Sequence, residues 1–239
     1  MIGKNINSTK ILEQNKNSWD AMADSWFGST ALPSYGCLVP SEEELQLFPA
    51  LTGKKVLDIG CGSGHSLKWC KEHGAEEIWG LDMSTRQLEN ARTYLTQSGY
   101  EPHLINAPME SDCGLPTDYF DVVYSIYALG WTVDLNTTID RISRYLKRDG
   151  ILIFSWDHPL MHCIDAEGEK LVLNGSYLNE NPLSYIQRGN PVTIHNHKMS
   201  GWINEKDSGG TRVNVFPYGE DPGDPRGPEA HLNERAHLA

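Results

Sequence analysis

Three glycines at alternate positions form the clearest chemical pattern in the chain. Gly60, Gly62 and Gly64 follow the apolar stretch VLDI, Asp58 stands two residues before the first glycine, and Cys61 lies between the first two. Glycine lets the backbone adopt positive φ and approach a bound molecule closely. Amides at the start of a following helix can receive a carboxylate, and a nearby acid can hold an ammonium group. The pattern predicts a turn that binds a nucleotide-type cofactor.

Two kinds of cofactor fit this turn to different degrees. A dinucleotide fingerprint, G-x-G-x-x-G or A, needs a small third residue for close packing of helix on strand, and His65 stands at that position. Counting to Gly64 instead gives G-x-G-x-G. Asp82, at the end of the next apolar stretch, can accept both hydroxyls of a ribose in either case. It therefore does not separate the two cofactors.

A regular alternation of elements must position these residues. Strands are predicted at Val56–Ile59, Glu77–Asp82, Pro102–Asn106, Tyr119–Ala128 and Ile151–Trp156, and helices at residues 10–27, 63–73, 84–99 and 135–146, with a further helix that begins at Ser41. Such alternation indicates an α/β fold in which a mostly parallel, doubly wound sheet is covered on both faces. Ligands of these sheets bind beyond the carboxyl ends of the strands. The residues that follow each strand are therefore the candidates for function.

The later blocks of the chain carry a resemblance to a known family. The segments NAPME (Asn106–Glu110), FDVVY (Phe120–Tyr124) and RYLKRDG (Arg144–Gly150) follow the G-x-G-x-G turn in order. From about residue 54 to 156 the chain resembles class I S-adenosylmethionine-dependent methyltransferases. Tyr35-Gly36, SIYALGWTVDL and SWDHP further resemble a bacterial small-molecule-type subgroup. The resemblance implies a Rossmann-like fold and S-adenosylmethionine as the cofactor, with Asn106 where the family commonly has Asp.

The resemblance and the strand ends together give a set of candidate site residues. The expected cofactor-binding residues are Asp58, Gly60, Cys61, Gly62, Gly64, Asp82, Met83, Asn106, Ala107, Pro108, Met109 and Ser125. The expected acceptor-binding residues are Tyr35, Tyr127, Trp131 and His158. His158 is the candidate general base because histidine can remove a proton near neutral pH, and Asp157 beside it could do similar work. Trp19 and Trp26 could also line an acceptor pocket.

Composition excludes several other classes of function. The formal net charge is -12, whereas a nucleic-acid surface needs clustered Lys and Arg. The five cysteines are odd in number and no pair has CxxC spacing, so neither a disulfide framework nor a metal site is expected, and a reducing cytoplasm is the natural compartment. The N-terminus lacks the apolar core of a signal peptide. No apolar run approaches the roughly 20 residues that span a membrane.

The expected organisation has three parts. Residues 1–50 are a helical cap over the cofactor cleft, residues 51–218 are the methyltransferase domain, and residues 219–239, rich in Pro, Gly and charge, are a disordered tail. Residues 211–216 are a candidate sixth strand. The family usually completes its sheet with an antiparallel pair, and the second strand of that pair is not found, so this sheet edge is expected to be incomplete. A monomer or a homodimer is expected.

The resemblance implies methyl transfer from S-adenosylmethionine to a small-molecule acceptor, with release of S-adenosylhomocysteine. Two alternatives stay open: a catalytically inactive protein that binds the same cofactor, and an NAD(P)-binding oxidoreductase. Ser125–Ala128 stands where nucleobase amino-group methyltransferases carry an Asn/Asp-Pro-Pro-Tyr-like tetrad, and this argues against an RNA acceptor. The sequence leaves open whether the acceptor atom is O, N or C.

Overall fold

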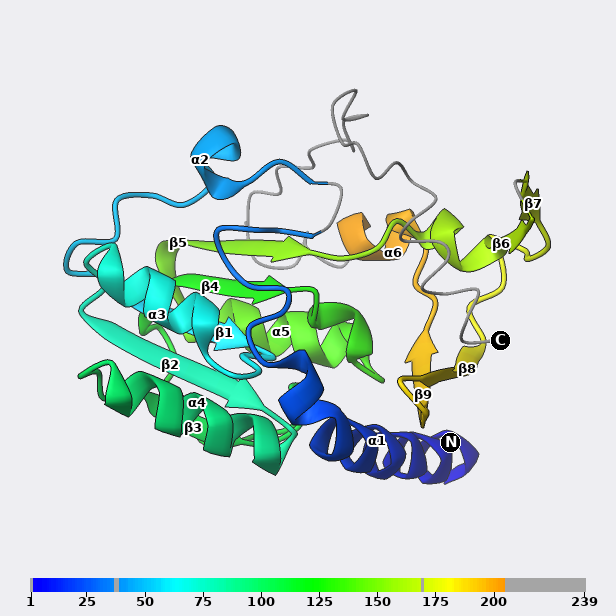
Figure 1. The fold of residues 1–239 in the computed structure, drawn as a ribbon, viewed down its shortest axis with the longest axis horizontal. Coiled ribbons are helices and arrows are strands. Elements are labelled where there is room, and N and C mark those ends of the chain that lie inside the picture. The colour runs from blue at the N-terminus through cyan, green and yellow to red at the C-terminus, as the bar shows by residue number, and fades with distance from the viewer. Residues whose placement is uncertain (1, 37–38, 169, 205–239) are drawn as a thin grey trace.

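The protein has a central parallel sheet, which the computed structural model shows in Figure 1. The structure describes residues 2–36, 39–168 and 170–204; the candidate strand at 211–216 and the tail at 219–239 lie outside them. The sheet has five strands, β1 (Lys55–Ile59), β2 (Glu77–Asp82), β3 (His103–Asn106), β4 (Phe120–Ile126) and β5 (Leu146–Ser155). Their order is β3-β2-β1-β4-β5 and every pairing is parallel. The predicted α/β, doubly wound sheet is confirmed.

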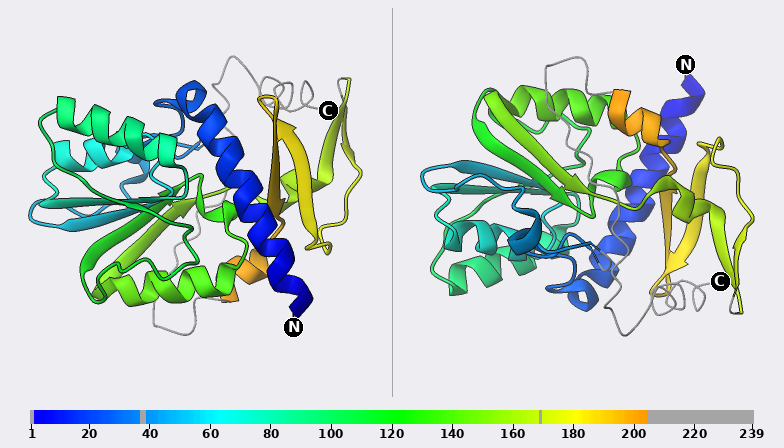
Figure 2. Two further views of the ribbon diagram at one scale, coloured as in Figure 1. Left: turned by 90° about the horizontal axis from the view of Figure 1, so that it is seen from below. Right: turned by 90° about the horizontal axis from the view of Figure 1, so that it is seen from above.

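Helices cover both faces of this sheet, as Figure 2 shows. They are α3 (His65–Glu72), α4 (Thr85–Gln97) and α5 (Leu135–Tyr145). Successive side chains of a strand point to opposite faces, and β1 shows this directly. Val56 joins a buried cluster with residues of α3 and α4, while Leu57 joins a second cluster with residues of α5.

The helices that follow the strands begin at capping residues. Ser84 precedes α4 and its Oγ accepts a hydrogen bond from the Gln87 amide at 3.1 Å. Asp134 does the same for α5 through the Thr137 amide, also at 3.1 Å. The helix predicted from residue 63 begins two residues later, because Gly64 takes a left-handed conformation as its N-cap.

A second layer of structure lies beside the carboxyl edge of the sheet. Its elements are α1 (Ile2–Met22), η1 (Ala23–Trp26), η2 (Leu129–Trp131), η3 (Pro159–Cys163), β6 (Ile164–Glu167), β7 (Lys170–Leu173), β8 (Pro182–Gln187), β9 (Asn190–His195) and α6 (Met199–Asn204). The short helix α2 (Glu42–Leu45) lies apart from this layer, on the face of the sheet that α3 covers. The hairpin β8–β9 was not predicted, and α1 starts well before residue 10. Within the described ranges, no antiparallel strand pairs with β5.

Side-chain hydrogen bonds join α1 to β9. Asn15 is fully buried, and its Nδ2 donates to the Thr193 carbonyl at 2.7 Å while its Oδ1 accepts from the Thr193 amide at 2.9 Å. Ser18 Oγ donates to the Pro191 carbonyl at 2.6 Å. Because Asn15 satisfies both backbone groups of Thr193, α1 and the hairpin form one unit, which Figure 2 shows side by side. We call this unit, α1 together with β8–β9, the cap.

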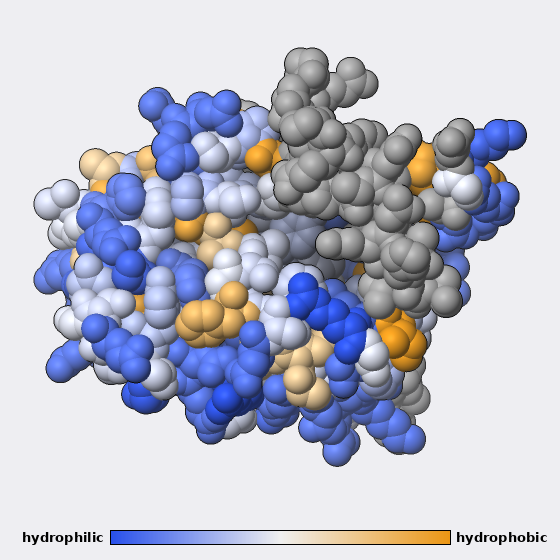
Figure 3. All heavy atoms as spheres, viewed as in Figure 1, coloured by the Kyte–Doolittle hydropathy of each residue, from blue (hydrophilic) through white to orange (hydrophobic). Residues whose placement is uncertain are grey.

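The surface seen in Figure 3 is hydrophilic over most of its described area, with apolar residues in small separate groups. This agrees with the acidic composition of the chain. In the part of the chain that the structure describes, no helix is both long enough and apolar enough to cross a bilayer.

Candidate functional site

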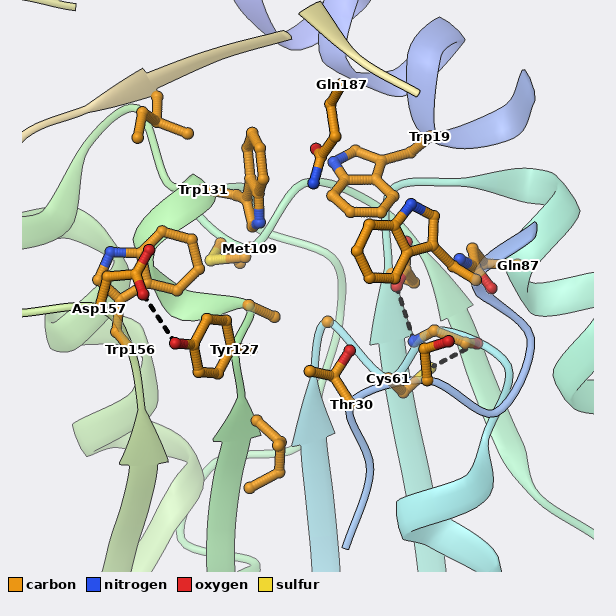
Figure 4. A pocket seen from close by; sticks show the side chains of 18 of the residues that line it. Trp19, Thr30, Cys61, Gln87, Met109, Tyr127, Trp131, Trp156, Asp157 and Gln187 are labelled. Carbon is orange, nitrogen blue, oxygen red and sulfur yellow. Dashed lines mark hydrogen bonds between the residues drawn. The ribbon is translucent and has the colours of Figure 1, made fainter. Parts of the chain in front are cut away.

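A cavity of about 1290 Å³ lies between the carboxyl edge of the sheet and the cap (Figure 4). Eleven of the predicted site residues line it: Asp58, Gly60, Cys61, Gly62, Asp82, Met83, Ala107, Met109, Tyr127, Trp131 and His158. They come from the ends of β1, β2, β3, β4 and β5. In parallel strands these ends meet at one edge, so the topology brings together residues that are far apart in sequence.

Two predicted cofactor residues serve the packing of the fold and do not line the cavity. Gly64 has a φ of 79°, and a Cβ there would lie 3.0 Å from Leu95 Cδ1 and 3.1 Å from Ala91 Cβ, so it lets the turn pack against α4. Ser125 is fully buried, and its Oγ donates to the Ile59 carbonyl at 2.8 Å. Its side chain therefore joins β4 to β1 and does not line the cavity.

Three further predicted residues also lie outside the cavity wall. Asn106 Nδ2 donates to the carbonyls of Asp82 and Met83, both at 3.0 Å, and so holds the end of β2. Pro108 offers its carbonyl to the Ser111 amide at 3.0 Å, within a turn. Tyr35, expected to bind the acceptor, is buried instead.

The Tyr35 hydroxyl donates to Glu42 Oε2 at 2.6 Å, which ties the segment before α2 to that helix. Its aromatic ring belongs to the cluster of buried residues on the α3 and α4 face. This partner could not be predicted from the sequence, because an aromatic residue before a sheet suits a core as well as a pocket.

The glycine turn is fixed by close contacts on both sides. Gly60 has a φ of 76°, and a Cβ at this position would lie 2.2 Å from Ala128 Cβ. Gly62 has a φ of 50°, and its amide donates to Asp82 Oδ2 at 2.9 Å. Positive φ favours glycine, and the contact with Ala128 also requires it at residue 60. The turn therefore lies directly against the end of β4.

Asp82 is held in one orientation by backbone amides. Its Oδ2 accepts from Gly62 and its Oδ1 accepts from the Ser84 amide at 2.8 Å. Burial raises the pKa of this carboxyl to about 6, although these two amides act in the opposite direction. A carboxylate oxygen has two acceptor sites, so each oxygen keeps capacity for one more donor. This arrangement can receive a pair of hydroxyls.

Three residues that line the cavity each carry a buried polar atom without a hydrogen-bond partner among the described residues. The atoms are Asp58 Oδ1, Gln87 Oε1 and Trp26 Nε1. Burial, and then the charge of Asp82, raises the pKa of Asp58 well above its usual range. A buried polar group without a partner costs about 1–3 kcal/mol. These atoms therefore fit a polar, partly cationic ligand such as S-adenosylmethionine.

The other part of the cavity has an aromatic wall, drawn in Figure 4. Trp131 lies edge-on to Trp19 of α1 at 5.2 Å between ring centroids and to Trp156 at 6.0 Å. Trp156 in turn lies 5.7 Å from Tyr127. These four residues, named here the aromatic wall, come from α1, η2 and the ends of β4 and β5. Trp156 was not singled out from the sequence, although its place directly after a central strand could have indicated it.

The cap contributes more residues that sequence reasoning missed. Tyr185, Gln187 and Arg188, at the end of β8, line the cavity. The Arg188 guanidinium lies 3.9 Å from the Trp26 ring centroid and donates to the Ser25 carbonyl. Without an expected hairpin, nothing in the sequence placed these residues near the sheet.

A second link joins α1 to the cofactor side of the cavity. Asp20 Oδ1 accepts from Ser84 Oγ at 2.7 Å and from the Arg86 amide at 3.1 Å. Burial alone would raise the pKa of Asp20, but hydrogen bonds from Lys16, Ser84 and Arg86 hold it below its usual range. Asp20 is therefore a charged carboxylate at the start of α4, next to the segment that carries Asp82.

Comparison with known proteins gives the class of this fold. Residues 57–154 match the family described as "Methyltransferase domain". The chain is similar to an S-adenosylmethionine dependent methyltransferase from Mesorhizobium loti, with a TM-score of 0.62 and 25% identity, over 82% of this chain and 88% of that one. The five-stranded parallel sheet with its flanking helices is the Rossmann-like fold of class I methyltransferases.

Curated relatives agree with this class. An uncharacterised protein of Haemophilus influenzae is 38% identical over 129 residues, which cover 53% of this chain and 50% of the relative. A ubiquinone biosynthesis O-methyltransferase of Actinobacillus pleuropneumoniae is 34% identical over 109 residues, or 44% of this chain and 46% of the relative. The matches thus span about half the length of these relatives. The domain match at residues 57–154, the similar structure from Mesorhizobium loti and the relative from Actinobacillus pleuropneumoniae are all methyltransferases, which agrees with the resemblance seen in the sequence.

Proposed function

We propose that this protein transfers a methyl group from S-adenosylmethionine to a small-molecule acceptor and releases S-adenosylhomocysteine. One observation carries the proposal: a single cavity joins the glycine turn and Asp82, which suit the cofactor, to the aromatic wall, which suits an acceptor. The volume of about 1290 Å³ exceeds the roughly 300–1,000 Å³ of ordinary ligand pockets. This supports a site for two molecules.

The residues of the sheet edge would bind the cofactor. Asp82 would accept the two ribose hydroxyls, and the backbone of Gly60–Gly62 would lie against the amino-acid end. Asp58 would receive the cofactor's ammonium group, directly or through water. Its raised pKa belongs to the free protein; an adjacent cation favours the ionised carboxylate. Met83, Ala107 and Met109 would border the adenine.

The cap and the aromatic wall would complete the other part of the site. The sulfonium supplies a strong leaving group, so the protein must mainly align the acceptor and exclude water. Trp19 and the hairpin enclose the cavity from the side opposite the sheet. Such enclosure, together with the acidic net charge of -12, supports a small acceptor over a nucleic acid. We further propose a cytoplasmic protein that acts as a monomer or homodimer.

The assay for this function is product formation. The full chain is incubated with S-adenosylmethionine and a panel of acceptors, and S-adenosylhomocysteine is measured by mass spectrometry. Hydroxylated compounds come first in the panel, since the relative from Actinobacillus pleuropneumoniae is named an O-methyltransferase. Acceptor-dependent product is expected. Cofactor binding without product from any acceptor would favour the inactive alternative, and binding of NAD alone would favour the oxidoreductase.

A further inference from the structure

A tyrosine and a carboxylate form a hydrogen-bonded pair at the acceptor side of the cavity. The Tyr127 hydroxyl donates to Asp157 Oδ1 at 2.7 Å, and both residues line the cavity. Tyr127 follows β4 and Asp157 follows β5, two strands that pair in the sheet. Figure 4 shows the pair on the side of the cavity opposite Cys61 and Gln87. A carboxylate thus lies beside Trp156 and Tyr127 of the aromatic wall, within the lining of the cavity.

The backbone and ring of Tyr127 are held in place by several contacts. Its φ is 55°, a left-handed value that costs a non-glycine residue about 1–3 kcal/mol. Its amide donates to both the carbonyl and the hydroxyl of Ser155, at 3.1 and 3.2 Å. A Cβ on Gly36 would lie 2.7 Å from the Tyr127 ring, so the ring packs against that backbone. These contacts fix the direction in which the hydroxyl points.

His158, the base expected from the sequence, has a different role in this geometry. Its Nδ1 accepts a hydrogen bond from the Leu160 amide at 3.2 Å, as the cap of η3. In the neutral imidazole the proton must then sit on Nε2, which makes that nitrogen a donor. Nδ1, the nitrogen that could take a proton, already accepts a hydrogen bond from the backbone. The neighbouring Asp157 has a carboxyl group, whose oxygens are the other candidate proton acceptors.

We propose that Asp157 accepts the proton of an aromatic hydroxyl acceptor, and that Tyr127 positions the Asp157 carboxylate. This deepens the proposed methyl transfer and rests on it. The aromatic wall favours a flat ring, since aromatic pairs gain from edge-to-face and offset contacts. Asp157, at the end of β5 beside the wall, meets the polar edge of such a ring.

The step conserves atoms and electrons. As the acceptor oxygen attacks, a bond forms between this oxygen and the methyl carbon, and the bond between carbon and sulfur breaks with its electron pair left on sulfur. The proton of the hydroxyl passes to Asp157. A phenol has a pKa of about 10, so most of it is neutral at pH 7 and is a weak nucleophile. A positioned base contributes about 10²–10⁴-fold to such a reaction.

The decisive experiment compares an acceptor that carries a proton with one that does not. 2-Naphthol and 2-naphthalenethiol share a ring system, but the arylthiol ionises at much lower pH and needs no base at pH 8. Asp157→Asn should lower kcat for the naphthol by about 10²–10⁴-fold. Its kcat for the thiol should stay within a few-fold of the wild-type value. Tyr127→Phe should lower kcat for the naphthol by about tenfold, with little change in KM.

Tyr119→Phe is the matched control. Its hydroxyl bonds Glu77 at 2.8 and 3.0 Å, the same kind of pair, at the opposite edge of the sheet. It should not alter the ratio of naphthol to thiol turnover. Equal losses for both acceptors in Asp157→Asn would show a merely structural role and overturn the proposal. Wild-type protein that methylates neither naphthol nor other phenols would overturn the acceptor class.

A binding measurement separates this proposal from the proposed function. Calorimetry with S-adenosylhomocysteine on the wild type and on Asp157→Asn should give the same Kd. In the S-adenosylhomocysteine complex, the absorbance of added 4-nitrophenol should show ionisation at lower pH in Asp157→Asn than in the wild type, because the carboxylate repels the phenolate. An unchanged ionisation curve contradicts the role of Asp157. Loss of cofactor binding by the wild type itself would instead refute the proposed function.

Discussion

The sheet edge and the cap build the two sides of the cavity by different means. At the sheet edge, the contacts join the ends of adjacent strands of the central sheet: Gly62 and Ser84 hold Asp82, and Gly60 packs on Ala128. In the cap, the key contact joins Asn15 to Thr193, which are 178 residues apart. The cofactor side is therefore held by contacts within the central sheet. The acceptor side depends instead on the contact between α1 and β9, which lie far apart in the sequence.

Gly60→Ala should give the largest effect, because it damages the sheet edge directly. The new Cβ would stand 2.2 Å from Ala128 Cβ on a residue with a φ of 76°. Cofactor affinity should fall by more than about 100-fold, since both the turn and the end of β4 must move. Calorimetry with S-adenosylhomocysteine measures this. Gly53→Ala, which also has positive φ but meets nothing within 4 Å, is the control and should keep the wild-type affinity.

Asp82→Ala should be the next largest. It removes both acceptors that we propose for the ribose and leaves the amides of Gly62 and Ser84 without their partner. The loss of even one hydrogen bond to a charged group costs about 1.5–3 kcal/mol, so affinity should fall by at least about 10- to 100-fold. An unchanged Kd in a folded Asp82→Ala variant would remove Asp82 from the cofactor site.

The pKa of Asp82 also predicts how cofactor affinity depends on pH. Burial raises this pKa to about 6 in the free protein, and the ionised form offers the stronger acceptors. Affinity should therefore rise between pH 5 and pH 7 and level off above that. Asp82→Asn should show a flatter profile over the same range. A wild-type profile that falls as pH rises would contradict this assignment.

These predictions concern the side of the site that the sequence predicted well. The strands, their parallel order and the cavity-facing positions of Asp58, Gly62 and Asp82 follow from local patterns of apolar residues, glycines and caps. Ser125 and Tyr35 could not be placed in this way, because their side chains are directed by partners elsewhere, the Ile59 carbonyl and Glu42. Strand alternation gives the face on which a residue lies, but not its partner.

The cap could be predicted only in part. Trp19 and Trp26 indicated an apolar pocket, yet the hairpin β8–β9 has a weak pattern, with Leu183 and Ile186 exposed. Its position is set by Asn15 and Ser18, whose polar side chains show no periodicity that points to a distant strand. Asp157 was noticed from the sequence, but its bond to Tyr127 required the pairing of β4 with β5.

Asn15→Ala tests the stability of the cap. It leaves the buried amide and carbonyl of Thr193 without partners, which should reduce the free energy of unfolding by about 1–3 kcal/mol. Trp19 lies one helical turn after Asn15 on α1, so a loosened helix should displace this part of the aromatic wall and raise the acceptor KM. The Kd of S-adenosylhomocysteine should change less. Asn17→Ala, at an exposed position of the same helix, should cost less than about 0.5 kcal/mol. Chemical denaturation measures both.

Gly130→Ala should give the smallest and most local effect. A Cβ there would lie 1.8 Å from Cε2 of Trp156, whose ring rests on this glycine. The ring would have to shift, and acceptor KM should rise several-fold with cofactor Kd unchanged. Steady-state kinetics with calorimetry on the same preparation checks this. Equal loss of both affinities would mean that the two sides of the cavity are not separable.

The central claim is that this cavity binds S-adenosylmethionine through the sheet edge. Isothermal titration calorimetry of the full chain with S-adenosylmethionine, beside the same titration with NAD, tests it most directly. We predict one site per chain for S-adenosylmethionine, no heat of binding with NAD, and loss of affinity in Asp82→Ala. A folded protein that binds NAD, or that shows no binding of S-adenosylmethionine or of S-adenosylhomocysteine, would contradict the account.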